Sequence, residues 1–220
     1  MTGPGFDTRP ERLPPTLPLF PLSGVLLLPR SRLPLNVFEP RYLNLVDDAL
    51  AGDRLIGMIQ PEQRETGDAP PPLFKIGCVG RIISFAEEGS RYLIALSGIC
   101  RFEQGNELPT TRGYRRIVPD WARFLGDFDT EAAPPVDRAR LTRGLKTFFK
   151  ANGLSADWTS IEQAPDEGLV NSLAMICPFT PAEKQALLEA ETLARRVAIL
   201  TGLVEMAAIH GNPDGPGARH

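Results

Sequence analysis

Short apolar blocks separated by turn residues run through the first half of the chain, and this pattern predicts β-strands. The blocks lie at 17–22, 24–29, 54–60, 74–86, 91–103 and 113–124. Four turn-type residues, Glu87-Glu88-Gly89-Ser90, join two of these blocks and predict a β-hairpin. Both faces of the second hairpin arm are largely apolar, as in a barrel or a covered sheet.

Proline and glycine residues indicate where these strands end, bend or lie at a sheet edge. Pro18 and Pro21 indicate that the 17–22 strand lies at a sheet edge or that the prolines fall at its ends. Glycines inside the hairpin blocks, Gly77, Gly80 and Gly98, predict bulges or bends, which a barrel needs. The first half therefore reads as a strongly curved sheet.

One helical pattern interrupts the strands, at residues 38–52. Pro40 stands in the first turn, where its missing N–H costs little, and Gly52 stands at the end. Apolar residues at helical period form one stripe, comprising Tyr42, Leu43, Val46, Ala49 and Leu50. We expect this helix to pack on the sheet.

Helical periodicity dominates after an acidic, Pro-containing stretch. Helices are expected at 137–153 and at 166–177, where Leu169, Val170, Leu173 and Ile176 share a face. A capping box at Thr180-Pro181-Ala182-Glu183 starts a further helical run, which is too long for one helix and is expected to break at about 190–192. The second half is thus a helical bundle.

These changes of pattern divide the chain into five parts. We expect a disordered leader at 1–15, a β-rich subdomain at 16–125, a linker at 126–136, a helical subdomain at 137–210 and a disordered tail at 211–220. The fold class is therefore α+β.

Composition counts against common catalytic sites. The two histidines, His210 and His220, lie near the C-terminus, which argues against a Ser-His-Asp triad, a Cys-His dyad or a multi-His zinc site. The sequence contains no P-loop and no zincin or nucleophile-elbow motif. The three cysteines lack C-x-x-C spacing and are expected to be buried free thiols. We expect no catalytic residue, cofactor or metal; a dyad of Ser172 and Lys184 is the open alternative.

Charge and hydropathy bear on partners and location. The 24 Lys and Arg residues are outnumbered by 27 Asp and Glu residues, which counts against nucleic-acid binding. The apolar run at 17–28 is broken by Pro and Gly and is too short to span a bilayer. Residues 1–16 lack the apolar core of a signal peptide. We expect a cytoplasmic protein that does not contact membranes. One cationic set recurs at helical spacing, as on a solvated helix face: Arg138, Arg140, Arg143, Lys146 and Lys150.

An ordered set of motifs carries a family resemblance. LPLFPLSGVLLLPRSRLPLNVFEPRYLNLV opens it, followed by GMIQP, IGCVGRI, YLIALSGICRFE and QALLEAETLARRVAILTGLV. The strand-turn-FEPRY-helix opening and the L-x-G-x-x-R-F strand are the most specific parts. Over about 17–204 the chain resembles the N-terminal, substrate-binding domain of Lon proteases, as a stand-alone bacterial protein lacking the ATPase and peptidase domains. The resemblance implies a PUA-like β pseudo-barrel followed by a helical bundle.

The resemblance also implies binding rather than catalysis. In Lon this domain is an early contact for unfolded or tagged substrates, so such polypeptides and an AAA+ protease are the expected partners. Binding is expected near the 38–52 helix and in a groove between the two halves. RNA binding is the alternative, since PUA-like barrels include RNA binders. The sequence indicates no oligomeric state.

Seven residues are candidates for this binding surface. Four of them match the FEPRY motif: Phe38, Glu39, Arg41 and Tyr42. The other three are aromatic candidates for an apolar patch: Trp121, Phe124 and Trp158. For all seven the alternative is a structural role, in which Glu39 and Arg41 fix the start of the helix and the aromatic side chains pack in the core.

Overall fold

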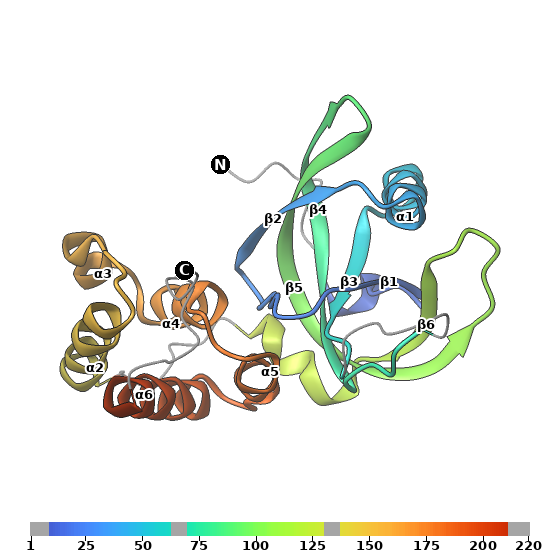
Figure 1. The fold of residues 1–220 in the computed structure, drawn as a ribbon. Helices are drawn as coiled ribbons and strands as arrows, with labels where there is room; N and C mark the ends of the chain where they lie inside the picture. The colour runs from blue at the N-terminus through green and yellow to red at the C-terminus, as the bar shows by residue number, and fades with distance from the viewer. Residues whose placement is uncertain (1–8, 63–69, 130–136, 211–220) are drawn as a thin grey trace. The chain divides into compact units, whose positions relative to one another are not determined.

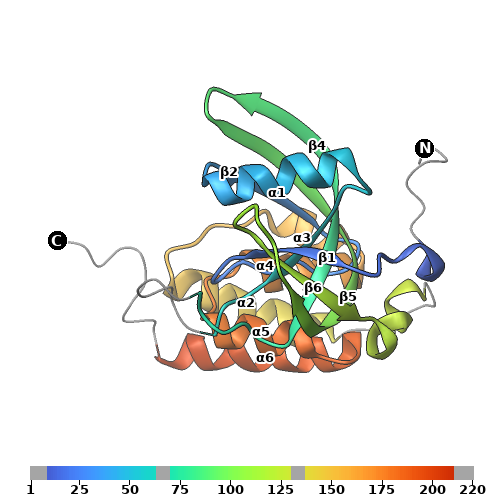
Figure 2. The ribbon, with the colours of Figure 1, turned by 90° about the vertical axis from the view of Figure 1, so that its right-hand side faces the viewer.

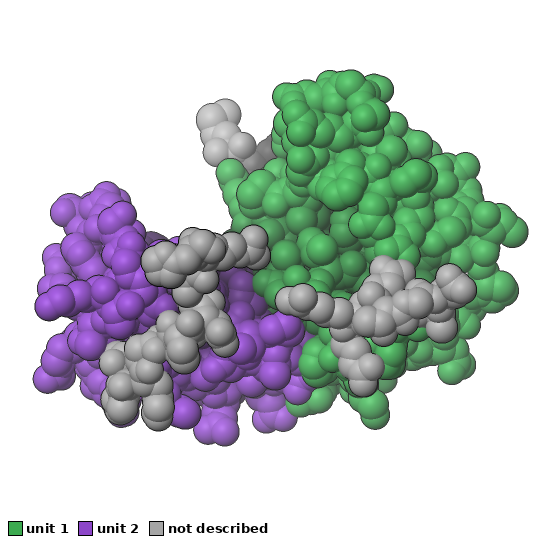
Figure 3. Space-filling model, in the orientation of Figure 1, with its two compact units in different colours: residues 1–131 green, residues 132–220 purple. Residues whose placement is uncertain are grey.

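The computed structural model describes residues 9–62, 70–129 and 137–210, except for the side chains of 208–210. The chain divides into two compact units, residues 1–131 and 132–220 (Figure 3). No helix within the described ranges is long and apolar enough to cross a membrane.

Unit 1 is built on one six-stranded sheet (Figure 1). Its strands are β1 (Leu17–Pro21), β2 (Arg32–Val37), β3 (Leu55–Ile59), β4 (Ile76–Glu88), β5 (Arg91–Leu108) and β6 (Arg115–Asp120). The strand order is β2-β5-β4-β3-β1-β6, and β5 also pairs with β6, so the sheet curls back on itself. Only the β1–β3 pair is parallel among these pairings. The result is a pseudo-barrel rather than a closed barrel, and with the helices of unit 2 it confirms the predicted α+β fold.

The predicted hairpin is confirmed as β4 and β5. Register shifts between Val79 and Gly80 and between Ile82 and Ser84 show the irregularity that the glycines predict. β1 lies between β3 and β6, so the first alternative for its prolines, a sheet edge, is wrong. Pro18 is second and Pro21 last in the strand, which agrees with the alternative that the prolines fall near its ends. The apolar block at 24–29 forms no strand, although its leucines at 26–28 are buried.

One α-helix and two 3-10 segments complete unit 1. Helix α1 (Pro40–Ala51) begins at the predicted proline and buries Tyr42, Leu45, Val46 and Ala49. Figure 2 shows α1 side-on, below the tip of the β4–β5 hairpin. The 3-10 segments are η1 (Pro10–Arg12) and η2 (Ala122–Phe128).

The structure differs from two predicted boundaries. Within the expected leader, residues 10–12 form η1, Pro14 is buried, and the Pro14 carbonyl accepts a hydrogen bond from Trp121 Nε1 at 3.3 Å. Within the expected linker, residues 126–128 belong to η2, because Asp127 is paired with Arg101 of β5. Most of the remaining leader, linker and tail lies outside the described residues.

Unit 2 is helical, as predicted. Its helices are α2 (Arg138–Ala151), α3 (Trp158–Gln163), α4 (Asp166–Ile176), α5 (Pro181–Glu189) and α6 (Leu193–His210). The capping box at Thr180 starts α5, and the predicted break separates α5 from α6. The sequence pattern predicts neither α3 nor β2. Ile176, which the helical spacing groups with Leu169, Val170 and Leu173, is the last residue of α4 and is 70% exposed.

A candidate binding pocket beside the FEPRY segment

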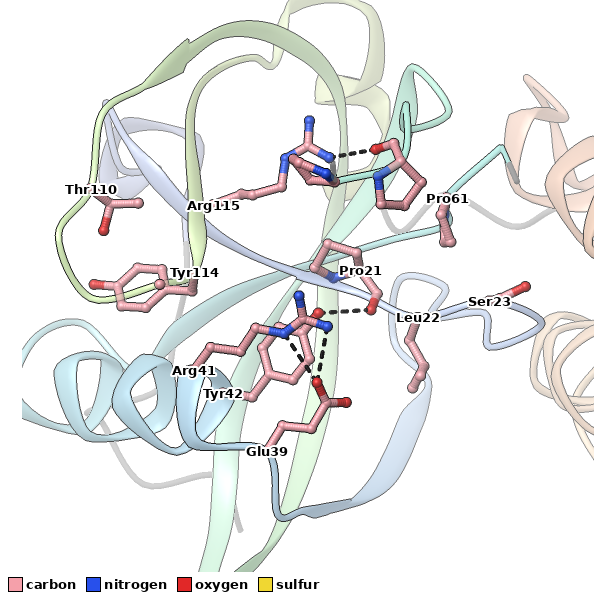
Figure 4. Close-up of a pocket in the computed structure, with 13 residues that line it drawn as sticks. Pro21, Leu22, Ser23, Glu39, Arg41, Tyr42, Pro61, Thr110, Tyr114 and Arg115 are labelled. Atoms are coloured by element: carbon pink, nitrogen blue, oxygen red, sulfur yellow. Dashed lines mark hydrogen bonds and ion pairs between the residues drawn. The ribbon is translucent and has the colours of Figure 1, made fainter. Parts of the chain in front are cut away.

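A pocket of about 700 Å³ opens in unit 1 beside the start of α1 (Figure 4). Prolines and tyrosine rings contribute much of its lining, together with a few polar groups. The lining residues are Pro21, Leu22, Ser23, Glu39, Arg41, Tyr42, Pro61, Pro70, Pro71, Thr110, Gly113, Tyr114 and Arg115. Its volume lies within the range of ligand-binding pockets in proteins.

The FEPRY segment forms one wall of the pocket. Pro40 starts α1, so Glu39 is the N-cap and Arg41 lies in the first turn. Arg41 Nε and Nη2 lie 3.0 and 2.9 Å from Glu39 Oε2. The Arg41 guanidinium lies 4.7 Å from the centre of the Tyr42 ring. These contacts hold a cation, a carboxylate and an aromatic ring at the pocket surface (Figure 4).

Tyr42 is held in place by contacts with β1. Its ring stacks on Phe20 of β1, with 4.2 Å between the ring centres, and it is 6% exposed. Its hydroxyl donates to the Pro21 carbonyl at 3.4 Å. This part of the wall is therefore fixed by the core of unit 1.

A second wall comes from the β5–β6 connection and the start of β6. Arg115 Nε and Nη2 donate to the two carboxylate oxygens of Glu107, at 2.9 and 2.7 Å, and Arg115 Nη1 donates to the Pro71 carbonyl at 2.8 Å. Such a forked pair holds the guanidinium in one orientation. The backbone φ of Gly113 is 83°, which favours glycine at this turn.

Tyr114 joins this wall to α1. Its hydroxyl donates to Asp48 Oδ2 at 2.7 Å. Burial, and then this hydrogen bond, raises the pKa of Tyr114 above its ordinary value. The tyrosine therefore stays protonated at neutral pH. The sequence reading assigned no function to Tyr114 or Arg115, although Arg112, Arg115 and Arg116 stand out as a small cationic cluster.

The structure brings three of the seven candidate residues together. Glu39, Arg41 and Tyr42 line the pocket. Phe38 precedes them in the chain and is 66% exposed, but it is not part of the lining. The expected groove between the two halves stays a prediction, because the units are described separately.

The other three aromatic candidates lie elsewhere. Phe124 is 2% exposed and lies under the Arg101 guanidinium at 4.5 Å, so it belongs to the core rather than to a surface patch. Trp121 is half-buried and meets Phe102 edge-on at 5.9 Å. Trp158 is also half-buried, in unit 2, against Phe149 at 5.8 Å. Packing therefore accounts for much of what these three side chains do.

The described residues do not form the two kinds of site considered next, a Ser-Lys dyad and a metal site. Ser172 is exposed, whereas Lys184 is buried and donates from Nζ to the Met175 carbonyl at 3.0 Å. Burial lowers the pKa of Lys184. This geometry does not favour a Ser172–Lys184 dyad. Among the described residues, no three His, Cys, Asp or Glu side chains gather as a metal site requires.

The three thiols, Cys78, Cys100 and Cys177, are buried and free, as predicted. Burial raises the pKa of Cys100 and of Cys177 to about 12, and that of Cys78 well above its ordinary value. Since the thiolate is the reactive form, we expect Ellman's reagent at about pH 8 to label the folded protein roughly a thousandfold more slowly than an exposed cysteine. All three thiols should react at once in denaturant. Rapid labelling of the folded chain would contradict this prediction and reveal a reactive thiol.

Comparison with known proteins gives a consistent picture. The chain is 25% identical over 208 residues to a Lon protease of Syntrophus aciditrophicus, covering 90% of this chain and 26% of that protein. It is 35% identical over 166 residues to a Lon protease of Dictyoglomus thermophilum, covering 74% of this chain and 19% of that protein. The chain thus spans about a quarter or less of the length of these relatives.

Solved structures share the fold. A Lon N-terminal domain protein from Xanthomonas campestris matches with a TM-score of 0.59 and 22% identity, covering 85% of this chain and 97% of that one. The N-terminal domain of a Mycobacterium avium complex Lon protease matches with a TM-score of 0.58 and 15% identity, covering 86% and 97%. The family model of the substrate-binding domain of the ATP-dependent protease La (LON) matches residues 16–205. The chain therefore belongs to the LON substrate-binding domain family.

Proposed function

We propose that this chain is a non-catalytic protein-binding module whose unit 1 pocket holds a segment of an unfolded or tagged polypeptide. The observation that carries the proposal is the position of Glu39, Arg41 and Tyr42. These residues of the FEPRY motif line a pocket of about 700 Å³, in a chain whose family is named for substrate binding.

The pocket chemistry suits a segment of polypeptide. The rings of Tyr42 and Tyr114 are buried and only shape the wall. Pro21, Pro70 and Pro71 keep exposed surface and are stiff, so little conformational entropy is lost when a ligand covers them. Covering their apolar surface contributes about 25 cal/mol for each Å² removed from water. The arginine N–H groups and the hydroxyls of Ser23 and Thr110 are donors for the carbonyl oxygens of a bound backbone. Apolar contact would thus supply the affinity, and the polar rim would orient the chain.

The proposal extends to partner and location. An AAA+ protease or a chaperone in the cytoplasm is the partner that we propose. The similarity to the N-terminal parts of Lon proteases supports this choice.

Filling the pocket tests the proposal. Thr110 lines the pocket and is exposed, so Thr110→Trp places an indole in the space without disturbing the core. We expect the wild-type chain to bind reduced, carboxymethylated lactalbumin at tens of micromolar, and Thr110→Trp to weaken this binding about tenfold. Fluorescence anisotropy of the labelled lactalbumin measures both affinities.

The neighbouring residue provides a matched control. Thr111 is equally exposed but does not line the pocket, so Thr111→Trp adds the same indole outside it. Its affinity should stay within about twofold of the wild type. Absence of binding by the wild-type chain, or equal binding by both variants, would contradict the proposed role of the pocket.

A further inference from the structure

Helix α2 in unit 2 carries five cationic residues and no acidic one. The first two are compensated: Arg138 pairs with Asp166, and Arg140 pairs with Glu205 at 2.8 Å. The other three, Arg143, Lys146 and Lys150, are exposed. Within the described part of the chain, none of these three forms an ion pair within 4 Å, although Arg143 adds to the effect of Arg140 in lowering the pKa of Glu205. We call Arg143, Lys146 and Lys150 the cationic face of α2.

Helix stability does not explain the cationic face. Arg143 and Lys146 are three residues apart, and Lys146 and Lys150 are four apart, so each pair consists of neighbouring like charges, which destabilise a helix. The helix dipole favours a cation in the last turn, and this accounts for Lys150. Arg143 and Lys146 lie in the middle of α2, where the dipole gives them little. The dipole, the Trp158 ring and Glu205 thus compensate part of these charges, and an anionic ligand would relieve the like-charge repulsion that remains.

The surface beside this face is hollowed. A depression of about 310 Å³ is lined by Arg138, Ala139, Thr142, Arg143, Lys146 and Glu162, of which Glu162 alone is acidic. Lys146 Nζ lies 5.4 Å from the centre of the Trp158 ring, and that ring packs on Phe149. The indole thus holds the Lys146 ammonium group beside the hollow.

We propose that the cationic face of α2 binds an acidic, extended segment of a partner polypeptide. The rise of 1.5 Å per helical residue places Arg143 and Lys150 about 10 Å apart along the axis. Side chains on one side of an extended chain recur about every 6.6 Å, so two or three carboxylates reach the three cations. The hollow beside Arg143 and Lys146 leaves room for part of the backbone.

Nucleic acid fits this face less well. Proteins that bind duplex DNA tightly neutralise roughly six to ten phosphates, whereas this face offers three cations on a chain with a formal net charge of −3. Base stacking would need an open aromatic face, but Lys146 already lies over the Trp158 ring. The polypeptide is therefore the occupant that the charges and geometry favour. This site is separate from the unit 1 pocket and does not depend on the proposed function.

The test measures anisotropy of a short labelled peptide in which Glu alternates with Ser, added to the full chain. We expect the peptide to bind, and the affinity to fall as ionic strength rises, because the contacts are charge pairs near the surface. Combining Arg143→Gln, Lys146→Gln and Lys150→Gln should weaken binding about tenfold. The melting temperature of this triple variant should stay close to that of the wild type, because removing two like-charge contacts offsets the loss of the Lys146–Trp158 contact and of the dipole interaction of Lys150.

A second triple variant controls for net charge. Exposed cations outside the face are replaced in it, by Arg32→Gln, Lys75→Gln and Arg195→Gln. It should bind the peptide within about twofold of the wild type. Equal losses in the two triple variants would overturn the proposal, as would equal binding of a peptide with Gln in place of Glu. Tighter binding of single-stranded RNA than of the acidic peptide would overturn it in favour of a nucleic-acid site.

Discussion

Replacing Asp127 by Ala is expected to destabilise unit 1 by about 3–5 kcal/mol, because the substitution removes the carboxylate that faces the buried Arg101 guanidinium. The two residues are 4% and 8% exposed, for Arg101 and Asp127 respectively. Arg101 donates to the Asp127 carboxylate from Nε at 3.2 and 3.0 Å, from Nη2 at 2.7 Å, and from its backbone N at 2.9 Å. The substitution thus removes every one of these hydrogen bonds at once.

The same pair fastens η2 to the sheet. Arg101 belongs to β5 and Asp127 to η2, and the guanidinium also covers the Phe124 ring at 4.5 Å. Arg30 adds a hydrogen bond to the Asp127 carbonyl. Loss of the Asp127 carboxylate should therefore weaken the attachment of η2 to the sheet. It should also remove the counter-charge that faces the Arg101 guanidinium.

Urea unfolding measures this prediction if unit 1 is observed alone. Unit 1 contains Trp121 and unit 2 contains Trp158, so a Trp158→Phe background makes fluorescence report on unit 1. In that background Asp127→Ala should lower the unfolding midpoint sharply. Asp129→Ala removes an exposed carboxylate two residues away and should change stability by about 0.5 kcal/mol or less. A midpoint for Asp127→Ala that matches Asp129→Ala would show that Arg101 finds another partner.

Local signals made much of the fold predictable. The hairpin follows from two apolar blocks around a four-residue turn, and the start of α5 follows from its capping box, in which Thr180 Oγ1 accepts from Glu183 N at 3.3 Å. The break before α6 follows because Thr192 could cap a new helix, and its Oγ1 does accept from Arg195 N at 3.1 Å. Each signal lies within a few residues of the feature it specifies.

Features that depend on distant parts of the chain were missed. β2 contains Pro34 and alternates between exposed and half-buried positions, so its strand character depends on pairing with β5 about 60 residues later. The acidic, Pro-containing composition of residues 126–136 predicts a linker that includes Asp127. Its true place in η2 depends on Arg101, 26 residues earlier. Sequence patterns do not report such pairings.

The pocket likewise has one wall that local sequence predicts and one that depends on distant parts of the chain. Its FEPRY wall was predictable as a motif, because Glu39, Arg41 and Tyr42 are consecutive or nearly so. The opposite wall needs Tyr114 and Arg115, which come from another connection and reach the pocket through contacts with Asp48 and Pro71. Resemblance identified the segment, and the long-range topology of the sheet made it a pocket.

Gly98→Ala is expected to destabilise unit 1 by about 3 kcal/mol, at the upper end of what overpacking costs. A Cβ at this position would lie 2.0 Å from the Leu28 carbonyl oxygen and 2.8 Å from the Leu28 carbonyl carbon. Both are backbone atoms, so no side-chain rotation relieves the clash. Glycine is therefore required here by close approach of two backbone segments.

The segment opposite Gly98 has little freedom to retreat. Gly98 N donates to the Ser31 carbonyl and Arg30 N donates to the Gly98 carbonyl, both at 2.9 Å, so moving residues 28–31 away breaks the hydrogen bonds that join them to β5. Leu28 is itself fully buried, at 0% exposure. The added methyl group must either strain the backbone or break this connection.

Urea unfolding in the Trp158→Phe background measures the cost, with Gly126→Ala as the matched substitution in the same unit. The nearest atom to a Cβ at Gly126 is Asp129 Oδ2 at 3.7 Å, an ordinary van der Waals contact, so that variant should change stability by about 0.5 kcal/mol or less. If the two glycine variants unfold at the same urea concentration, residues 28–31 are able to move away from β5. The close approach of the Leu28 backbone would then not explain why the L-x-G-x-x-R-F strand has a glycine at this position. A sharp loss confined to Gly98→Ala instead explains two positions of the motif physically: the glycine admits the Leu28 backbone, and the arginine three residues later binds Asp127.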